Sequence, residues 1–247
     1  MTNAPHIARN VAKGQDVPFG SLESVLIGDG LKDAFTGESM GNTGETVAEE
    51  HGITREESDK FAVRSHSLAN EAWEKGWISE EVFPVGSLSI DEGIRPETNE
   101  EILSSLRTVF SEDGQVTAGN ASQVSDGASA VLIASEEKAK REGWPILARI
   151  VDYATSGVES NRVMSAPIPT VKKLLKITGM RLEDVDILEH NEAFASASCA
   201  IRGSLGIPDE SFNPHGGAIA IGHPLGATGA RCLMTLVNAM RRRESRR

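Results

Sequence analysis

The stretch that decides how this chain folds is GGAIAIGHPLGATGAR, residues Gly216 to Arg231. Its four consecutive apolar residues, Ala218 to Ile221, predict a short buried strand. Pro224 disfavours a helical conformation at His223, because the proline ring crowds the residue that precedes it. After Leu225 the apolar residues recur at spacings of three and four, which predicts a helix. His223 is therefore expected at a strand-to-helix turn, beside backbone N–H groups without a helical partner.

A histidine at such a turn has two interpretations. The free N–H groups and the imidazole can together hold a developing negative charge. Alternatively, the residue is a core histidine in a tight turn, which is the commoner situation for an isolated histidine. The rest of the chain has to decide between them.

Length, composition and charge restrict the class of protein. The chain has 247 residues, of which 39% are hydrophobic, so it is long and apolar enough for one large domain or two small ones. The formal charge of −11 argues against a general nucleic-acid-binding protein, which would present a basic face. Anionic substrates stay open, because the local field at a site matters more than the net charge.

Cysteine usage and hydropathy bear on the compartment. Cys199 and Cys232 are not part of a CxxC pair, so neither a disulfide scaffold nor a zinc site is expected. No run of 18 apolar residues exists, and the N-terminus lacks the apolar core of a signal peptide. The sequence thus predicts a cytoplasmic protein with no membrane partner and no metal.

Helical patterns recur along the chain. The clearest runs from Thr54 to Lys75, where Thr54 and Glu57 have the spacing of a capping box and Gly76 ends the pattern. The pattern predicts a surface helix that packs on a partner layer and has no chemical role. Further helices are expected at Thr46–Glu50, Glu97–Ser105, after Ser135, Pro167–Gly179 and His190–Gly206.

Apolar runs between these helices predict strands. They are expected at Val82–Ile90, Gly127–Ala134, Ile146–Tyr153 and Val185–Glu189. From Ala128 onward, strand and helix alternate, which indicates a layered α/β or mixed α/β/α domain. The residues before about 120 form an inserted or flanking region.

Two further clusters are candidates for chemistry. Asn191 starts the sequence NEAF just after an expected strand, where it can either cap a helix or orient a water or a carbonyl. Residues Thr117 to Asp126 are small and polar, which suits either a solvent loop or a surface for a long polar ligand. The chain contains neither a phosphate-binding P-loop motif nor the GxSxG motif of a nucleophilic serine.

Taken together, these motifs resemble the thiolase family, which includes acetyl-CoA acetyltransferases and 3-ketoacyl-CoA thiolases. The resemblance covers nearly the whole chain. It is carried by NAPH (Asn3–His6), DAFTGESMG (Asp33–Gly41), VTAGNASQVSDGASA (Val116–Ala130), APIP (Ala166–Pro169), NEAFA (Asn191–Ala195) and GGAIAIGHPLGATGAR.

The resemblance implies an α/β protein with a thiolase-like layered α/β/α fold, incomplete, with an inserted and mainly helical loop domain. Residues 1–120 would form the CoA-binding loop region with a remnant of the N-terminal thiolase domain. Residues 121–247 would form the C-terminal thiolase domain without its last strands. The implied activity joins acyl-CoA and acetyl-CoA to 3-oxoacyl-CoA and CoA, or runs in reverse as thiolysis, in fatty acid metabolism such as β-oxidation.

Family roles can be carried over to matching residues. His223 matches the histidine that activates a nucleophilic cysteine, and Asn191 matches the asparagine that anchors a water. Together they would form an oxyanion hole for the enolate of acetyl-CoA. Ser122 matches a contact to the pantetheine arm of CoA. Phe194 and Met40 would line the same tunnel, and His6 would lie near the acyl end. No cofactor is implied beyond the CoA thioester substrates.

Both cysteines of the family reaction are expected to be missing, because Cys199 and Cys232 match neither the CxS nor the CxGG motif of thiolases. The sequence therefore predicts a truncated thiolase chain that is inactive alone. Two alternatives stay open: one subunit of a split thiolase, or a non-catalytic acyl-CoA-binding or scaffold protein. A homo-oligomer or a complementing thiolase chain would be the corresponding protein partners, and no nucleic acid is expected.

Overall fold

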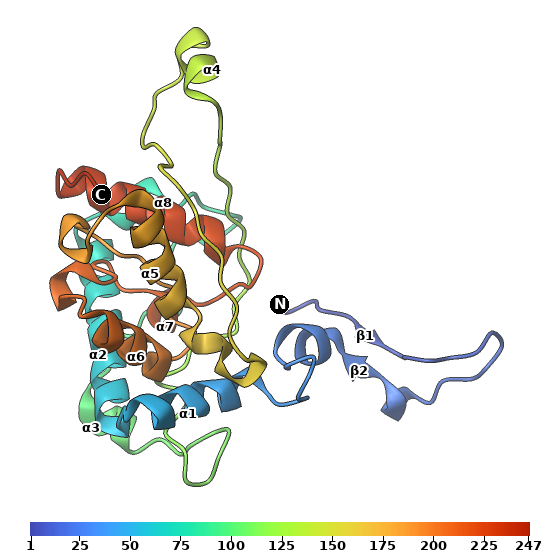
Figure 1. Ribbon diagram of the computed structural model, residues 1–247. Helices are drawn as coiled ribbons and strands as arrows, with labels where there is room; N and C mark the ends of the chain where they lie inside the picture. Colours follow the sequence, from blue (N-terminus) through green and yellow to red (C-terminus); the bar gives the residue numbers. More distant parts are fainter.

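Helix α2, Arg55–Glu74, is the longest element, and helices α3, α6 and α7 pack against it (Figure 1). The computed structural model describes residues 1–247. Beside α2 its helices are α1 (Met40–His51), α3 (Glu100–Ser104), α4 (Glu136–Arg141), α5 (Pro167–Thr178), α6 (Ala195–Leu205), α7 (Ala218–Ile221) and α8 (Thr228–Arg242). Strands β1 (His6–Ile7) and β2 (Glu23–Ser24) form the one sheet, which is antiparallel. Short 3-10 or π turns cover Phe19–Ser21, Leu26–Gly30, Ile78–Glu80, Ser160–Ser165, Leu182–Asp184 and Asp209–Ser211.

Local signals placed most of the helices correctly. Thr54 caps α2 through the capping box with Glu57, as predicted. Helix α5 begins at Pro167 and ends before Gly179, whose φ of 68° suits glycine. The helix predicted after Leu225 is α8. As predicted, α2 packs one face against the rest of the chain, and Ser65 on that buried face donates a hydrogen bond to Glu192, which follows Asn191 in sequence.

The strand predicted at Ala218–Ile221 is wrong, because these residues form the single helical turn α7. The carbonyl of Gly217 accepts hydrogen bonds from both Ala220 and Ile221, and the carbonyl of Ala218 accepts one from Gly222. Four apolar residues are too few for periodicity to separate a buried helix from a buried strand. The helix predicted from His190 likewise starts only at Ala195, so that the preceding residues are free to form a loop.

None of the four longer strands predicted from apolar runs is formed as a ladder. Val82–Ile90 contains only a local bridge between Val85 and Leu88, and Val185–Glu189 only one between Leu188 and Phe212. Residues 127–134 and 146–152 make no backbone–backbone hydrogen bond at all. Because a strand needs a partner along its edge, these apolar runs stay extended without becoming sheet.

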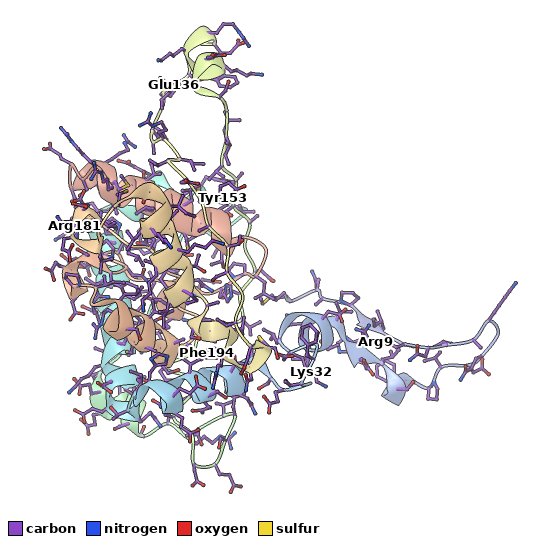
Figure 2. The ribbon with its side chains drawn as sticks, viewed as in Figure 1. Arg9, Lys32, Glu136, Tyr153, Arg181 and Phe194 are labelled. Carbon is purple, nitrogen blue, oxygen red and sulfur yellow. The ribbon has the colours of Figure 1, made fainter.

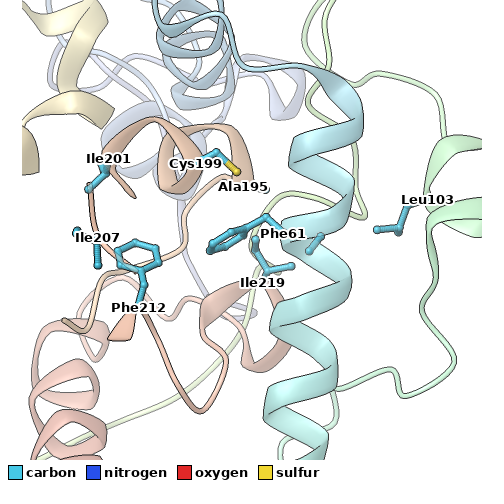
Figure 3. Packing of buried hydrophobic residues seen from close by; sticks show 9 residues of the cluster. Phe61, Leu103, Ala195, Cys199, Ile201, Ile207, Phe212 and Ile219 are labelled. Atoms are coloured by element: carbon cyan, nitrogen blue, oxygen red, sulfur yellow. The ribbon is translucent and has the colours of Figure 1, made fainter. Parts of the chain in front are cut away.

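The core lies between α2, α6 and α7. Its nine buried residues are Phe61, Ala62, Leu103, Ala195, Cys199, Ile201, Ile207, Phe212 and Ile219 (Figure 3). The rings of Phe61 and Phe212 meet edge to face with centroids 6.1 Å apart, a geometry that aromatic pairs prefer. Small residues fill most of α6, so this helix can approach α1 and α2 closely.

Two segments project from this helical body (Figure 1). The β1–β2 hairpin extends to one side. An arm consisting of residues 127–158 runs past α8 and ends in α4 at its tip, and both ends of the arm are hydrogen-bonded to the body, by Ser129 to Ala227 and by Lys173 to Thr155. Figure 2 shows Glu136 at that tip and Tyr153 on the returning branch. The arm exposes large apolar side chains: Leu132 is 79% exposed, Val151 71% and Tyr153 80%.

His66 on α2 provides a test of how the core responds to acid. It is buried, and its Nδ1 accepts a hydrogen bond from the backbone N–H of Arg95 at 3.2 Å. Burial, and then the charge of Arg95, lower its pKa to about 4. The folded chain thus keeps this imidazole neutral between pH 6.5 and 4, whereas the unfolded chain takes up a proton there.

The free energy of unfolding should therefore fall as pH falls from about 6.5 towards 4. In His66→Gln, urea unfolding between these pH values should show a slope reduced by up to about one proton per molecule. His51→Gln, which changes a histidine whose ring lies at the surface of α1, serves as the control and should keep the parent slope. An unchanged slope in His66→Gln would contradict the prediction.

Candidate active site

The turn that carries His223 is fixed by a polar loop from another part of the chain. The backbone N–H of His223 donates to the carbonyl of Gln123 at 3.1 Å. The side-chain amide of Gln123 in turn donates to the carbonyls of Ile219 (3.0 Å) and Ala220 (3.2 Å) in α7. Gly222 has a φ of 92°, which only glycine adopts readily, so the chain can leave α7 and place His223 in this turn.

The imidazole of His223 connects an asparagine to a threonine. The amide Nδ2 of Asn191 lies 3.2 Å from His223 Nε2, and Thr228 Oγ1 lies 2.6 Å from Nδ1. The Thr228 hydroxyl donates to the carbonyl of Pro224 at 3.0 Å, so it accepts from the ring. This pattern assigns the proton to Nδ1 and leaves the lone pair on Nε2, the nitrogen that faces Asn191.

Electrostatics keep this imidazole neutral. Burial lowers the pKa of His223, and the positive charge of Arg231 lowers it further. The side chain of Arg231 lies 3.7 Å from that of Glu189, whose carboxylate is almost completely buried. Burial raises the pKa of Glu189 to about 8. A neutral histidine with an unprotonated Nε2 can accept a proton from a substrate or a thiol.

The three predicted clusters come together in space. The loop Thr117–Asp126 pairs with the NEAF segment: the N–H of Ser122 donates to the carbonyl of Ala193 at 2.9 Å, and that of Ala195 donates to Asn120 at 2.8 Å. Through Gln123 the same loop holds the His223 turn. Asn191 and His223, 32 residues apart in sequence, are thereby brought into contact.

Of the other predicted residues, Phe194 and Met40 share one apolar cluster. Phe194 is buried with Val116 and Ala197, and Met40 packs against this cluster. Phe194 also meets Phe110 edge to face, with centroids 6.2 Å apart. Ser122 is half-buried in the loop beside them.

His6, the last of the predicted site residues, lies apart from the others. It is exposed on β1, in the hairpin that projects from the helical body, and the structure does not bring it to the Asn191–His223 pair (Figure 1). The APH motif alone carries no information on where the hairpin points, so its position could not be predicted from the sequence.

The two thiols of the chain are poorly suited to nucleophilic attack. Cys199 is buried in the core on α6, and its Sγ points to the carbonyl of Glu57 at 3.7 Å (Figure 3). Burial raises its pKa to about 12, and burial also raises the pKa of Cys232 on α8. Because the thiolate is the reactive form, neither side chain is activated in this structure.

Sequence reasoning missed Thr228 and Gln123. Thr228 lies five residues after His223, in the first turn of the following helix, and this short spacing could have indicated it as the partner of Nδ1. For Gln123 no local signal exists, because its acceptors in α7 lie about 96 residues further along the chain.

The structure contains neither a membrane-spanning helix nor a metal-binding cluster. No helix is both long and apolar enough to span a membrane. No three or more His, Cys, Asp or Glu side chains are grouped in a way that could hold a metal ion.

The sequence matches the family models of two domains that belong to the same enzyme family. Residues 1–137 match the thiolase N-terminal domain, and residues 144–247 match the thiolase C-terminal domain. The chain belongs to the thiolase family.

Named relatives agree with this assignment. The acetyl-CoA acetyltransferase of Shinella zoogloeoides is 42% identical over 255 residues, and the match covers 100% of this chain and 65% of the relative. A probable acetyl-CoA acyltransferase of Staphylococcus epidermidis is 40% identical, with 97% of this chain and 63% of the relative covered.

Solved structures confirm the predicted fold class. The crystal structure of human mitochondrial 3-ketoacyl-CoA thiolase superimposes with a TM-score of 0.91 at 40% identity and covers 98% of this chain. The match takes in 63% of that thiolase. The same human enzyme in complex with CoA gives the same TM-score. This chain therefore has a partial thiolase fold and spans about two thirds of the length of its relatives.

Proposed function

We propose that this chain provides the histidine–asparagine half of a thiolase active site, which acts on acyl-CoA and acetyl-CoA. The observation that carries the proposal is the contact between Asn191 and His223, with Thr228 holding the other ring nitrogen. The names of the relatives support the reaction class, 3-oxoacyl-CoA formation or its reverse. Fatty acid metabolism in the cytoplasm is the corresponding setting.

CoA thioesters are the proposed substrates. The human thiolase to which the chain is similar was solved in complex with CoA. In this chain the loop with Ser122 would contact the pantetheine arm, and Phe194 and Met40 would supply apolar contacts from their shared cluster. We also keep residues 1–120 as the proposed CoA-binding region and 121–247 as the proposed C-terminal domain.

In the proposed reaction a thiol of the enzyme attacks the acyl carbon of acyl-CoA. His223 Nε2 takes the thiol proton and passes it to the departing CoA sulfur, so CoA leaves as a thiol. A basic group of the complementing polypeptide then takes an α proton from acetyl-CoA, and the resulting carbanion attacks the acyl thioester. This step forms 3-oxoacyl-CoA and expels the enzyme thiolate, which takes up the α proton from that base and so returns as the thiol.

The same two side chains would stabilise negative charge. Once protonated, Nε2 of His223 donates a hydrogen bond to the thioester oxygen as it becomes an oxyanion. The Oδ1 of Asn191 is buried and accepts no hydrogen bond from the protein. It can therefore orient a water that donates the second hydrogen bond.

The attacking thiol would come from polypeptide outside these residues, since burial raises the pKa of both Cys199 and Cys232. The exposed, unpaired arm at residues 127–158 favours a complementing thiolase chain as the partner. Its extended apolar segments offer free N–H and C=O groups to added strands. About a third of the Shinella relative's polypeptide lies outside the match, which is enough to supply such strands.

The proposal is tested by assaying acetoacetyl-CoA thiolysis with and without a complementing polypeptide. That polypeptide would consist of the parts of the Shinella acetyl-CoA acetyltransferase that this chain does not match. Turnover is expected only in the mixture, and calorimetry should detect CoA binding. Turnover by the chain alone would show that an outside thiol is not required. CoA binding without turnover in either case would support the non-catalytic alternative.

The arm gives a separate prediction about assembly. Changing Leu132 and Val151 to lysine places charges on the segments proposed to pair with added strands. The double variant should bind the complementing polypeptide at least about tenfold more weakly in pull-down or calorimetric titrations. Glu136→Lys, at the tip on α4, is the control and should bind like the parent. If the parent, the double variant and Glu136→Lys all bound the complementing polypeptide equally well, the proposed pairing of the arm with added strands would be contradicted.

A further inference from the structure

A fully buried carboxylate follows the site asparagine in sequence. Glu192 is 0% exposed. Its Oε2 accepts a hydrogen bond from Ser65 Oγ at 2.6 Å and one from the backbone N–H of Ile219 at 3.3 Å. Its Oε1 accepts from Asn213 Nδ2 at 2.8 Å. One carboxylate thus joins α2, α7 and the segment that precedes α7.

Of the glycine pair before α7, Gly217 lies against this carboxylate and Gly216 lies against α2. The N–H of Gly217 donates to Ser65 Oγ at 3.1 Å, and a Cβ atom at Gly217 would lie only 2.6 Å from Glu192 Oε2. At Gly216 the φ is 73°, and a Cβ atom would lie 2.8 Å from the backbone nitrogen of Ala69. The position of the segment entering α7 is therefore set by close contact with Glu192 and α2.

These contacts act on the two candidate catalytic residues through the backbone. Asn191 is the residue before Glu192, and α7 ends at Ile221, two residues before His223. Asn213 also contacts the residue before Asn191, because its Oδ1 accepts a hydrogen bond from the N–H of His190 at 2.7 Å. The separation of Asn191 and His223 therefore depends on a framework with Glu192 at its centre.

We propose that Glu192 is a positioning residue that sets the distance between Asn191 and His223 by binding α2, α7 and Asn213 at once. For catalysis this inference rests on the proposed function, whereas the geometric part does not depend on it. Burial raises the pKa of Glu192, and its hydrogen bonds with Asn213, Ser65 and Ile219 oppose that effect. An apolar residue would fill the same space without these directional contacts, so packing alone does not explain a carboxylate here.

The test compares Glu192→Gln with Ser65→Ala and with the control Glu57→Gln. Glutamine keeps the size of the side chain, but its NH2 group replaces one of the two oxygens that accept hydrogen bonds from Ser65, Asn213 and Ile219. Ser65→Ala removes one donor and is the milder variant should Glu192→Gln fold poorly. Glu57 is a carboxylate at the start of α2 whose Oε2 accepts hydrogen bonds from the N–H and Oγ1 of Thr54, so its replacement by glutamine is the same chemical change without a hydrogen bond to α7 or Asn213.

Two readouts separate positioning from mere stability. The first is NMR of the folded chain: the side-chain amide of Asn191 and the ring of His223 should shift in Glu192→Gln and Ser65→Ala but not in Glu57→Gln. The second is thiolysis by the complemented enzyme, where kcat should fall about 10- to 100-fold in Glu192→Gln with KM within about threefold of the parent.

Unchanged Asn191 and His223 signals in both test variants would overturn the inference, whatever their thermal stability. So would an unaltered kcat in an active complemented enzyme. If the parent complemented enzyme shows no turnover, the proposed function fails, and the NMR comparison alone decides the role of Glu192.

Discussion

His223→Ala should reduce thiolysis by the complemented enzyme by roughly 10²- to 10⁴-fold, which is the range expected for loss of a general base or an oxyanion-hole donor. Alanine removes the Nε2 lone pair that faces Asn191 and the Nδ1 proton that Thr228 accepts. CoA binding by the chain should stay within a few-fold of the parent, because the loop containing Ser122 is not altered. Steady-state kinetics and calorimetry measure the two effects separately.

Two further variants test the two side chains that contact the His223 ring. Asn191→Ala should cause a loss of about 10²- to 10³-fold, since it removes the side chain proposed to hold the water. Thr228→Val keeps the shape but not the acceptor for Nδ1, so we expect a smaller loss of about tenfold. His51→Ala, a surface histidine on α1, is the matched control and should retain full activity. Near-normal rates in His223→Ala would refute the assignment of this site.

The helices show what the sequence could predict. The capping box at Thr54 and Glu57 and the glycine after Thr178 are local signals, and α2 and α5 begin and end where those signals indicate. Helix α8 followed from the regular spacing of its apolar residues. In each case the information lies within a few residues of the element, so no knowledge of the rest of the chain was needed.

Contacts between distant segments account for what the sequence could not predict. The strands expected at residues 127–134 and 146–153 have the right composition, but strand formation depends on a partner that the pattern does not name. The hydrogen bond of Ser65 to Glu192 joins residues 127 positions apart, so the pattern of α2 could not predict this contact.

The candidate site itself was predicted by resemblance and not by local pattern. From its neighbours alone, His223 reads as a core histidine in a turn, and Asn191 as a helix cap. The structure places the two in contact, and their catalytic roles stay predictions. The motifs did not indicate the hydrogen bonds that hold the segments of Asn191 and His223 in place. Gln123 and Glu192 make these bonds to residues that lie far away in the sequence.

Phe212→Ala should lower the free energy of unfolding by about 3–5 kcal/mol, the largest stability effect expected in this chain. The ring is fully buried, meets Phe61 edge to face and stacks on His190 with centroids 5.7 Å apart. Its removal leaves a cavity beside the residues that precede Asn191, so it should also broaden the NMR signals of the His223 ring. Phe83→Ala, at a position 78% exposed, is the control and should change stability by less than about 0.5 kcal/mol. Urea unfolding of the three proteins gives the comparison, and similar midpoints for both variants would show that the Phe61–Phe212 contact does not anchor the core.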